Sequence, residues 1–163
     1  MLNLAKGVFA SFQRHDVKYV VIGGVAAALH GVPRATFDLD ILIAATPRNA
    51  RRLLAALLEA GLGTASLTTA EDLLDHEITV FRDWIRIDVQ TGTPGLCFEE
   101  AWARRETMCY EAQEFYVVSR TDLIASKRAA GRPVDLEDAR LLETGSRPEE
   151  PASQCFCRPG PTP

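Results

Sequence analysis

Two short segments of this chain place carboxylates inside otherwise apolar strands, and this combination restricts the fold more than any other feature. Residues 37–43 read FDLDILI, with apolar side chains at alternate positions and Asp38 and Asp40 between them. On a strand, residues two apart point to the same face, about 6.6 Å apart along it. Residues 85–89 read IRIDV and add Asp88 in the same setting. Burying three carboxylates beside such apolar neighbours is costly unless they have cationic partners.

These three acids predict a cation site if the two strands are neighbours in one sheet. Carboxylates that share a pocket repel each other strongly unless cations lie among them. Divalent cations with oxygen ligands suit such a cluster, and Mg²⁺ is usually bound by one or two carboxylates together with substrate phosphates. The chemistry that this pattern indicates is metal-assisted phosphoryl or nucleotidyl transfer.

A glycine pair, Gly23 and Gly24, lies between a predicted buried strand over 17–22 and a short Ala-rich helix predicted over 25–29. Glycine lets backbone N–H groups approach a phosphate closely, and the start of a helix adds partial positive charge. The same pair also suits a tight strand-to-helix turn without a ligand, and exposed strands often carry acids. In combination with the three acids, however, the glycine pair favours a site that binds phosphates and cations.

The remaining periodicity predicts the α+β class, as a small mixed sheet with helices packed on one side. Apolar residues at helical spacing, or helix start signals, occur in segments 2–14, 47–60, 98–105 and 119–130. A last helix is expected from Asp135, as its N-cap, to about Glu143. Strand patterns occur in segments 76–81, 84–90 and 110–118, the first two joined as a hairpin by Arg82 and Asp83. Residues 62–74 show no clear pattern.

The length of 163 residues and the composition predict one folded domain over residues 1–144. Residues 145–163 are rich in proline and nearly free of large apolar side chains, so a disordered tail is expected there. The net charge of −4 argues weakly against an extended nucleic-acid surface. The cysteines and histidines fit no common zinc pattern. No apolar run is long enough for a membrane span and no signal peptide is evident, so we expect a cytoplasmic location.

The segment from Tyr19 to Ile43, YVVIGGVAAALHGVPRATFDLDILI, resembles the opening of minimal nucleotidyltransferases of the DNA polymerase β superfamily. Its form, Gly-Gly-x-Ala followed by His-Gly-x-x-Arg-x-Thr-x-Asp-Leu-Asp, is similar to the bacterial branch related to abortive-infection toxins of the AbiEii type. Residues 118–138, VSRTDLIASKRAAGRPVDLED, resemble the downstream helix pair of that branch. The resemblance therefore spans residues 17–143.

This resemblance implies a polymerase β-like nucleotidyltransferase fold followed by C-terminal helices. It implies that Gly23 and Gly24 hold the triphosphate of an NTP substrate. It also implies that Asp38 and Asp40 bind two Mg²⁺ ions, with Mn²⁺ as the alternative. Asp88 would be the third carboxylate, binding the catalytic ion and helping to deprotonate the acceptor. The implied reaction transfers a nucleoside monophosphate from the NTP to an acceptor hydroxyl and releases pyrophosphate.

Two basic residues are further candidates for phosphate contacts. Arg34 lies between the glycine pair and the acidic strand, where a guanidinium can bind phosphate through two hydrogen bonds. A solvated loop arginine fits that position equally well. Lys127 lies in the middle of a predicted helix, where a triphosphate contact and a solvent-facing lysine are equally consistent with the sequence. Asp135 and Asp138 match the family pattern, but helix capping and a salt bridge to Arg132 also explain them.

The acceptor is left open among a tRNA 3′ end, a protein side-chain hydroxyl and a small molecule such as an aminoglycoside or a lincosamide. The resemblance favours toxin-like modification of tRNA or protein, with an antitoxin as partner, over antibiotic adenylylation. The alternative from another class of protein is a non-catalytic module that binds a nucleotide or a partner.

Overall fold

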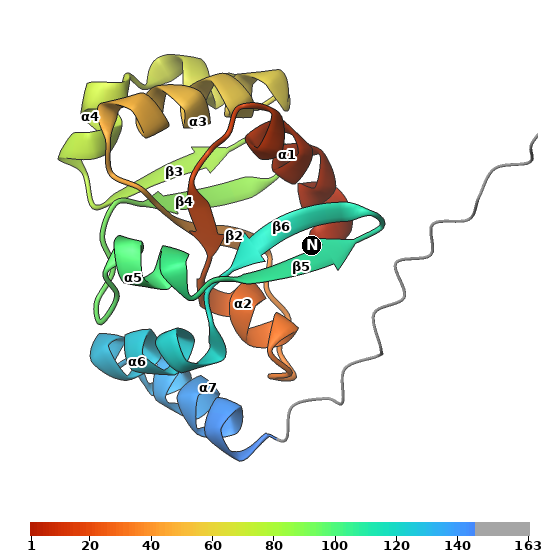
Figure 1. The fold of residues 1–163 in the computed structure, drawn as a ribbon, viewed down its shortest axis with the longest axis vertical. Helices are drawn as coiled ribbons and strands as arrows, with labels where there is room; N and C mark the ends of the chain where they lie inside the picture. Colours follow the sequence, from red (N-terminus) through yellow and green to blue (C-terminus); the bar gives the residue numbers. More distant parts are fainter. Residues whose placement is uncertain (146–163) are drawn as a thin grey trace, which may run out of the picture.

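A six-stranded mixed sheet lies at the centre of the computed structural model, which describes residues 1–145 (Figure 1). The strands lie in the order β3-β4-β2-β1-β6-β5. Their bounds are β1 (Tyr19–Val21), β2 (Asp38–Ile43), β3 (Ile78–Arg82), β4 (Arg86–Gln90), β5 (Glu106–Tyr110) and β6 (Gln113–Val117). The pairs β1–β6 and β2–β4 are parallel and the other three are antiparallel, so the predicted α+β class with a mixed sheet is confirmed.

Figure 1 shows the helix pair α6 and α7 at the opposite end of the molecule from α3 and α4. The bounds of the helices are α1 (Leu2–Arg14), α2 (Gly23–Leu29), α3 (Pro47–Glu59), α4 (Ala70–Asp75), α5 (Phe98–Ala103), α6 (Arg120–Ala130) and α7 (Pro133–Thr144), with a short 3₁₀ helix, η1 (Gly63–Leu67). The predicted disordered tail, residues 145–163, lies outside the described residues except for Gly145.

The two faces of the central strands differ because α1 packs on only one of them. The ring of Tyr19 on β1 stacks on Phe9 of α1, with the ring centroids 6.0 Å apart. Tyr19 pairs with Ile43 of β2, and directly opposite residues share a face. Alternation along β2 therefore places Leu39, Ile41 and Ile43 toward α1 and places Asp38 and Asp40, with Leu42, on the other face.

Helix α2 begins earlier than the predicted residue 25. Ile22 is extended, and its carbonyl oxygen accepts the first helical hydrogen bond from Ala26 N at 3.3 Å. The helix therefore begins at Gly23, and the glycine pair forms its first turn instead of preceding it.

Helix α7 also begins earlier than predicted, at Pro133, with Arg132 as its N-cap. Proline suits the first helical position because its φ is preset and it has no N–H to leave unpaired. Asp135 is therefore inside the first turn, and its prediction as the N-cap is wrong. By contrast, the helix predicted from residue 119 has Ser119 as its N-cap, with the hydroxyl accepting from the backbone N of Asp122 at 3.2 Å.

Both hairpins differ from the prediction at their turns. Arg82 still pairs with Arg86 in the β3–β4 ladder, so the turn consists of residues 83–85. Strand β5 begins at Glu106, well before the predicted residue 110. It is joined to β6 by Glu111 and Ala112, whose φ angles are +46° and +65°. Non-glycine residues rarely adopt positive φ, so the sequence carries no turn signal there.

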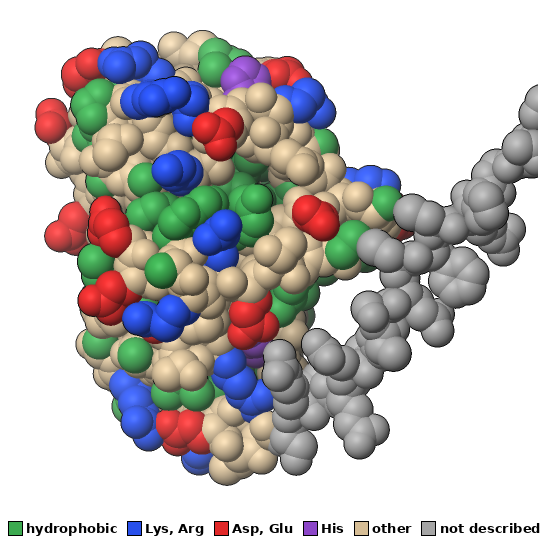
Figure 2. Space-filling view, viewed as in Figure 1, with side chains coloured by type: hydrophobic (Ala, Val, Ile, Leu, Met, Phe, Trp, Pro, Cys, Tyr) green, Lys and Arg blue, Asp and Glu red, His purple; other side chains and the backbone are tan. Residues whose placement is uncertain are grey.

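The surface of the described part carries charges of both signs. Figure 2 shows basic and acidic side chains interspersed on the face drawn. Within residues 1–145, no helix has both the length and the apolar character needed to cross a membrane.

Candidate active site

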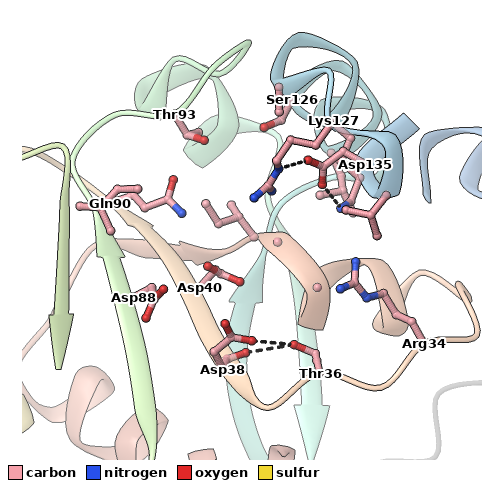
Figure 3. A pocket seen from close by; sticks show the side chains of 18 of the residues that line it. Arg34, Thr36, Asp38, Asp40, Asp88, Gln90, Thr93, Ser126, Lys127 and Asp135 are labelled. Carbon is pink, nitrogen blue, oxygen red and sulfur yellow. Dashed lines mark hydrogen bonds and ion pairs between the residues drawn. The ribbon is translucent and has the colours of Figure 1, made fainter. Parts of the chain in front are cut away.

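The three acids that the sequence singled out lie in one pocket. Strands β2 and β4 are parallel neighbours, and their register places Asp40 directly opposite Asp88 and Asp38 opposite Arg86. All four side chains line a cavity of about 340 Å³, and Figure 3 shows the three acids in it. The prediction that the two acidic strands are neighbours in one sheet is therefore confirmed.

The other predicted site residues reach the same cavity from different elements. Gly23 and Gly24 line it from the first turn of α2, Arg34 from the loop before β2, and Lys127 from α6. The structure thus brings together all seven residues that the sequence selected, although they span more than half of the chain.

The glycine turn packs directly against the acidic strand. Gly23 has a φ of +64°, and a Cβ atom at this position would overlap the carboxylate of Asp40. A Cβ atom at Gly24 would lie 2.9 Å from Thr36 Oγ1. The backbone of Gly24 also forms a hydrogen bond with Asp40. Close approach of the backbone to Asp40 therefore requires glycine here.

The acidic cluster changes the pKa of its central member. The pKa of Asp40 is raised to about 6, first because the carboxylate is buried and then because Asp38 and Asp88 carry negative charge beside it. The Gly24 hydrogen bond and the charge of Lys127 oppose this rise in part. A bound cation would favour the ionised carboxylate, and an all-oxygen donor set suits Mg²⁺ or Mn²⁺. Asp38 and Asp40 therefore fit the predicted ion.

Asp88 is already occupied by a neighbouring arginine. Arg86 Nε and Nη2 donate to the two carboxylate oxygens of Asp88, each at 2.8 Å. Asp38 accepts a hydrogen bond from Thr36 Oγ1 at 3.0 Å. Among the described residues, no group of three His, Cys, Asp or Glu side chains is arranged to hold a metal ion as it stands. Arg86 therefore competes with any ion for the carboxylate of Asp88.

Sequence reasoning did not select Arg86, although a signal was present. It lies two residues before Asp88 on the same strand, so both side chains point to one face. This spacing predicts that the side chains of Arg86 and Asp88, which carry opposite charges, lie close enough to form an ion pair.

Lys127 is buried in an ion-pair network between α6 and α7. Its Nζ lies 3.1 Å from Asp135 Oδ1 and 2.7 Å from Asp138 Oδ2, and its side chain is 5% exposed. The solvent-facing alternative is therefore wrong for this lysine. Burial by itself raises the pKa of Asp135, but hydrogen bonds from Arg132 and Lys127 outweigh it and hold that pKa below its usual value.

Arg34 belongs to the same network. Its Nη1 donates to Asp138 Oδ2 at 2.5 Å, the oxygen that Lys127 also contacts. The Arg34 side chain is 29% exposed, so part of the guanidinium faces the cavity. The helix pair α6–α7 thus places positive groups on the side of the pocket next to the glycine turn.

Comparison with known families covers nearly all of the described chain. Residues 3–143 match the model of a family described as "Nucleotidyltransferase of unknown function (DUF6036)". The matched range includes every strand of the sheet and all seven predicted site residues. A search of curated proteins found no match.

Proposed function

Because this chain belongs to the nucleotidyltransferase family DUF6036, we propose that it transfers a nucleoside monophosphate from an NTP to an acceptor hydroxyl and releases pyrophosphate. One observation carries the proposal: Asp38, Asp40 and Asp88 line a single cavity against a turn whose glycine cannot bear a side chain. An acidic cluster beside a backbone that a phosphate can approach suits the binding of a nucleotide together with cations.

The positive side of the pocket would receive the triphosphate. Gly23 and Gly24 leave the backbone accessible, and Arg34 presents a partly exposed guanidinium. Lys127 is held by its two carboxylates, but its charge reaches the pocket, because it lowers the pKa of Asp40. In this proposal Lys127 holds α6 and α7 together and adds positive charge near the phosphates. Arg34 contacts the phosphates directly.

The acidic side would receive the cations and the acceptor. Asp38 and Asp40, joined by Asp88 when Arg86 releases it, would hold two Mg²⁺ ions, with Mn²⁺ as the alternative. Such ions neutralise charge on the phosphates and polarise the phosphoryl oxygens. The acceptor oxygen forms a bond to the α-phosphorus, and the bond from that phosphorus to the bridging oxygen of the β-phosphate breaks. Pyrophosphate leaves, and Asp88 accepts the acceptor's proton.

Substitution of the acidic pair tests this proposal. The protein is incubated with each radiolabelled NTP, Mg²⁺ or Mn²⁺, total RNA and cell lysate. We expect label on an acceptor with the wild-type chain and none with Asp38→Ala or Asp40→Ala. Asp75→Ala provides the matched control, because Asp75 is an exposed acid outside the pocket. Transfer by both pocket variants at the wild-type rate would refute the roles assigned to these acids.

The position of the label identifies the acceptor. The resemblance to AbiEii-type toxins supports a macromolecular acceptor, tRNA or protein, and an antitoxin partner as the first choice. Adenylylation of an antibiotic is the second. Nucleotide binding without label on RNA, protein or small molecules would favour the non-catalytic module.

A further inference from the structure

The pocket has a third part besides its positive and acidic sides. The positive side is lined by Arg34, Lys127 and Arg132, with Asp135 among them. The third part carries three uncharged polar side chains, Gln90, Thr93 and Ser126, from three different elements. Figure 3 shows the Gln90 amide pointing into the cavity, with Thr93 and Ser126 along the same upper rim.

These three side chains are not used to hold the fold together. Within residues 1–145, no side-chain hydrogen bond joins Gln90, Thr93 or Ser126 to another residue, although each is half-buried. Ligand sites are typically concave surfaces with a few polar groups that converge from different elements. Free hydrogen-bonding groups at one end of this cavity therefore indicate a polar, uncharged part of a ligand.

The loop that carries Thr93 is fixed against α6. Gly95 has a φ of +73°, and a Cβ atom there would lie 2.8 Å from Ala129 Cβ and 2.9 Å from Ala125 O. The same Cβ atom would lie 3.2 Å from Ser126 Cα, so the loop contacts the helix backbone at Ser126 itself. The relative position of Thr93 and Ser126 is set before any ligand binds, which lowers the entropic cost of binding.

A nucleotide has the same division of chemistry as the pocket, with an anionic triphosphate at one end and an uncharged, hydrogen-bonding base at the other. Ser126 directly precedes Lys127, so the part of the cavity with uncharged polar side chains lies next to the part that we assign to the triphosphate. We propose, resting on the proposed function, that Gln90, Thr93 and Ser126 form the nucleobase subsite and that Gln90 selects adenine.

The chemistry of the amide determines this choice. A glutamine side chain offers one acceptor and one donor group side by side, which matches the N6 amino group and N7 of adenine. Guanine presents two acceptors, O6 and N7, at the corresponding edge, and arginine matches that pattern better. Gln90 is therefore a specificity-determining residue whose replacement changes the ratio of affinities for the two purines.

Binding of uncleavable analogues tests the inference without catalysis. The analogues of ATP and GTP carry a CH₂ group between the α- and β-phosphates, so the proposed reaction cannot break that link. Isothermal titration calorimetry with Mg²⁺ should show the wild-type chain binding the ATP analogue about tenfold more tightly than the GTP analogue. Gln90→Leu should reduce that ratio to about one, and Gln90→Arg should reverse it.

Gln113→Leu is the matched control, because Gln113 is also a half-buried glutamine at the end of a strand but lies outside this pocket. It should leave the ratio unchanged. Equal affinity of the wild-type chain for both analogues, or an unaltered ratio in Gln90→Leu, would overturn the adenine subsite while leaving the proposed function intact. Failure of the wild-type chain to bind either analogue would overturn the proposed function and the subsite with it.

Discussion

Replacing Asp40 with asparagine should stabilise the protein in the absence of divalent cations. Asp40 lies between two other acids and is largely removed from water, and these surroundings disfavour its ionised form. Asparagine keeps nearly the same shape without the charge. The variant should therefore gain stability, and under the proposed function it should lose nucleotidyl transfer, because asparagine would be a poorer ligand for a cation.

The magnitude follows from the pKa of Asp40. A rise from the ordinary value of 3.8 to about 6 corresponds to about 3 kcal/mol at 1.36 kcal/mol per pKa unit. Asp40 is not fully buried, and solvent screening makes this figure an upper value. We therefore expect Asp40→Asn to increase the free energy of unfolding by about 2–3 kcal/mol at pH 8.

The increase in the free energy of unfolding should be larger at high pH than at low pH. A carboxyl group whose pKa is raised in the folded state binds its proton more tightly there than in the unfolded chain. Its unfavourable contribution is absent below pH 3.8, grows as the pH rises toward 6, and is complete above that. The difference between variant and wild type should fall to about half its value at pH 5.

Urea denaturation in EDTA at pH 5 and pH 8, followed by circular dichroism, measures both quantities. Asp75→Asn controls for the loss of an exposed carboxylate. Addition of Mg²⁺ should stabilise the wild-type chain and not Asp40→Asn. An Asp40→Asn protein that is less stable than wild type at pH 8, or a difference that does not change with pH, would refute the reasoning.

Three further substitutions test other parts of the site. Lys127→Met should lower the free energy of unfolding by about 3 kcal/mol in urea denaturation, because it leaves buried carboxylates without their lysine; a loss below 1 kcal/mol would contradict the buried network. Gly23→Ala should cost about 1–3 kcal/mol in the same assay and remove transfer, because its φ is positive and the new Cβ overlaps a carboxylate; full activity would show that the turn can relax. Arg86→Gln should tighten Mn²⁺ binding in calorimetry, because it frees both oxygens of Asp88. Arg82→Gln, on the adjacent strand, should leave Mn²⁺ binding unchanged. Equal effects of the two substitutions would show that Arg86 does not compete with the ion for Asp88.

The sequence predicted those parts of the fold and site that local periodicity determines. Alternation in residues 37–43 is sufficient to place Asp38 and Asp40 on one face, and it requires no knowledge of the neighbouring strands. The serine cap of α6 follows from Ser119 and Asp122 alone. The convergence of Asp88 on the pair then needed only one further assumption, that β4 lies next to β2.

What the sequence could not predict depends on contacts between distant segments. Lys127 meets Asp135 and Asp138 only because α6 and α7 pack against each other, and a single helix pattern does not show how the next helix crosses it. The turn at Glu111 and Ala112 uses positive φ in residues that seldom adopt it, because a two-residue loop between the paired strands β5 and β6 requires that conformation.

One oxygen atom, Asp138 Oδ2, accepts hydrogen bonds from both Arg34 and Lys127. The effects of substitutions at these three positions will consequently be non-additive, because each substitution changes the charges that surround the other two residues. A loss of activity in an Arg34 variant can arise from a displaced helix pair as readily as from a lost phosphate contact. Double-mutant cycles that combine Arg34 and Asp138 substitutions are therefore required before any catalytic share is assigned to either residue.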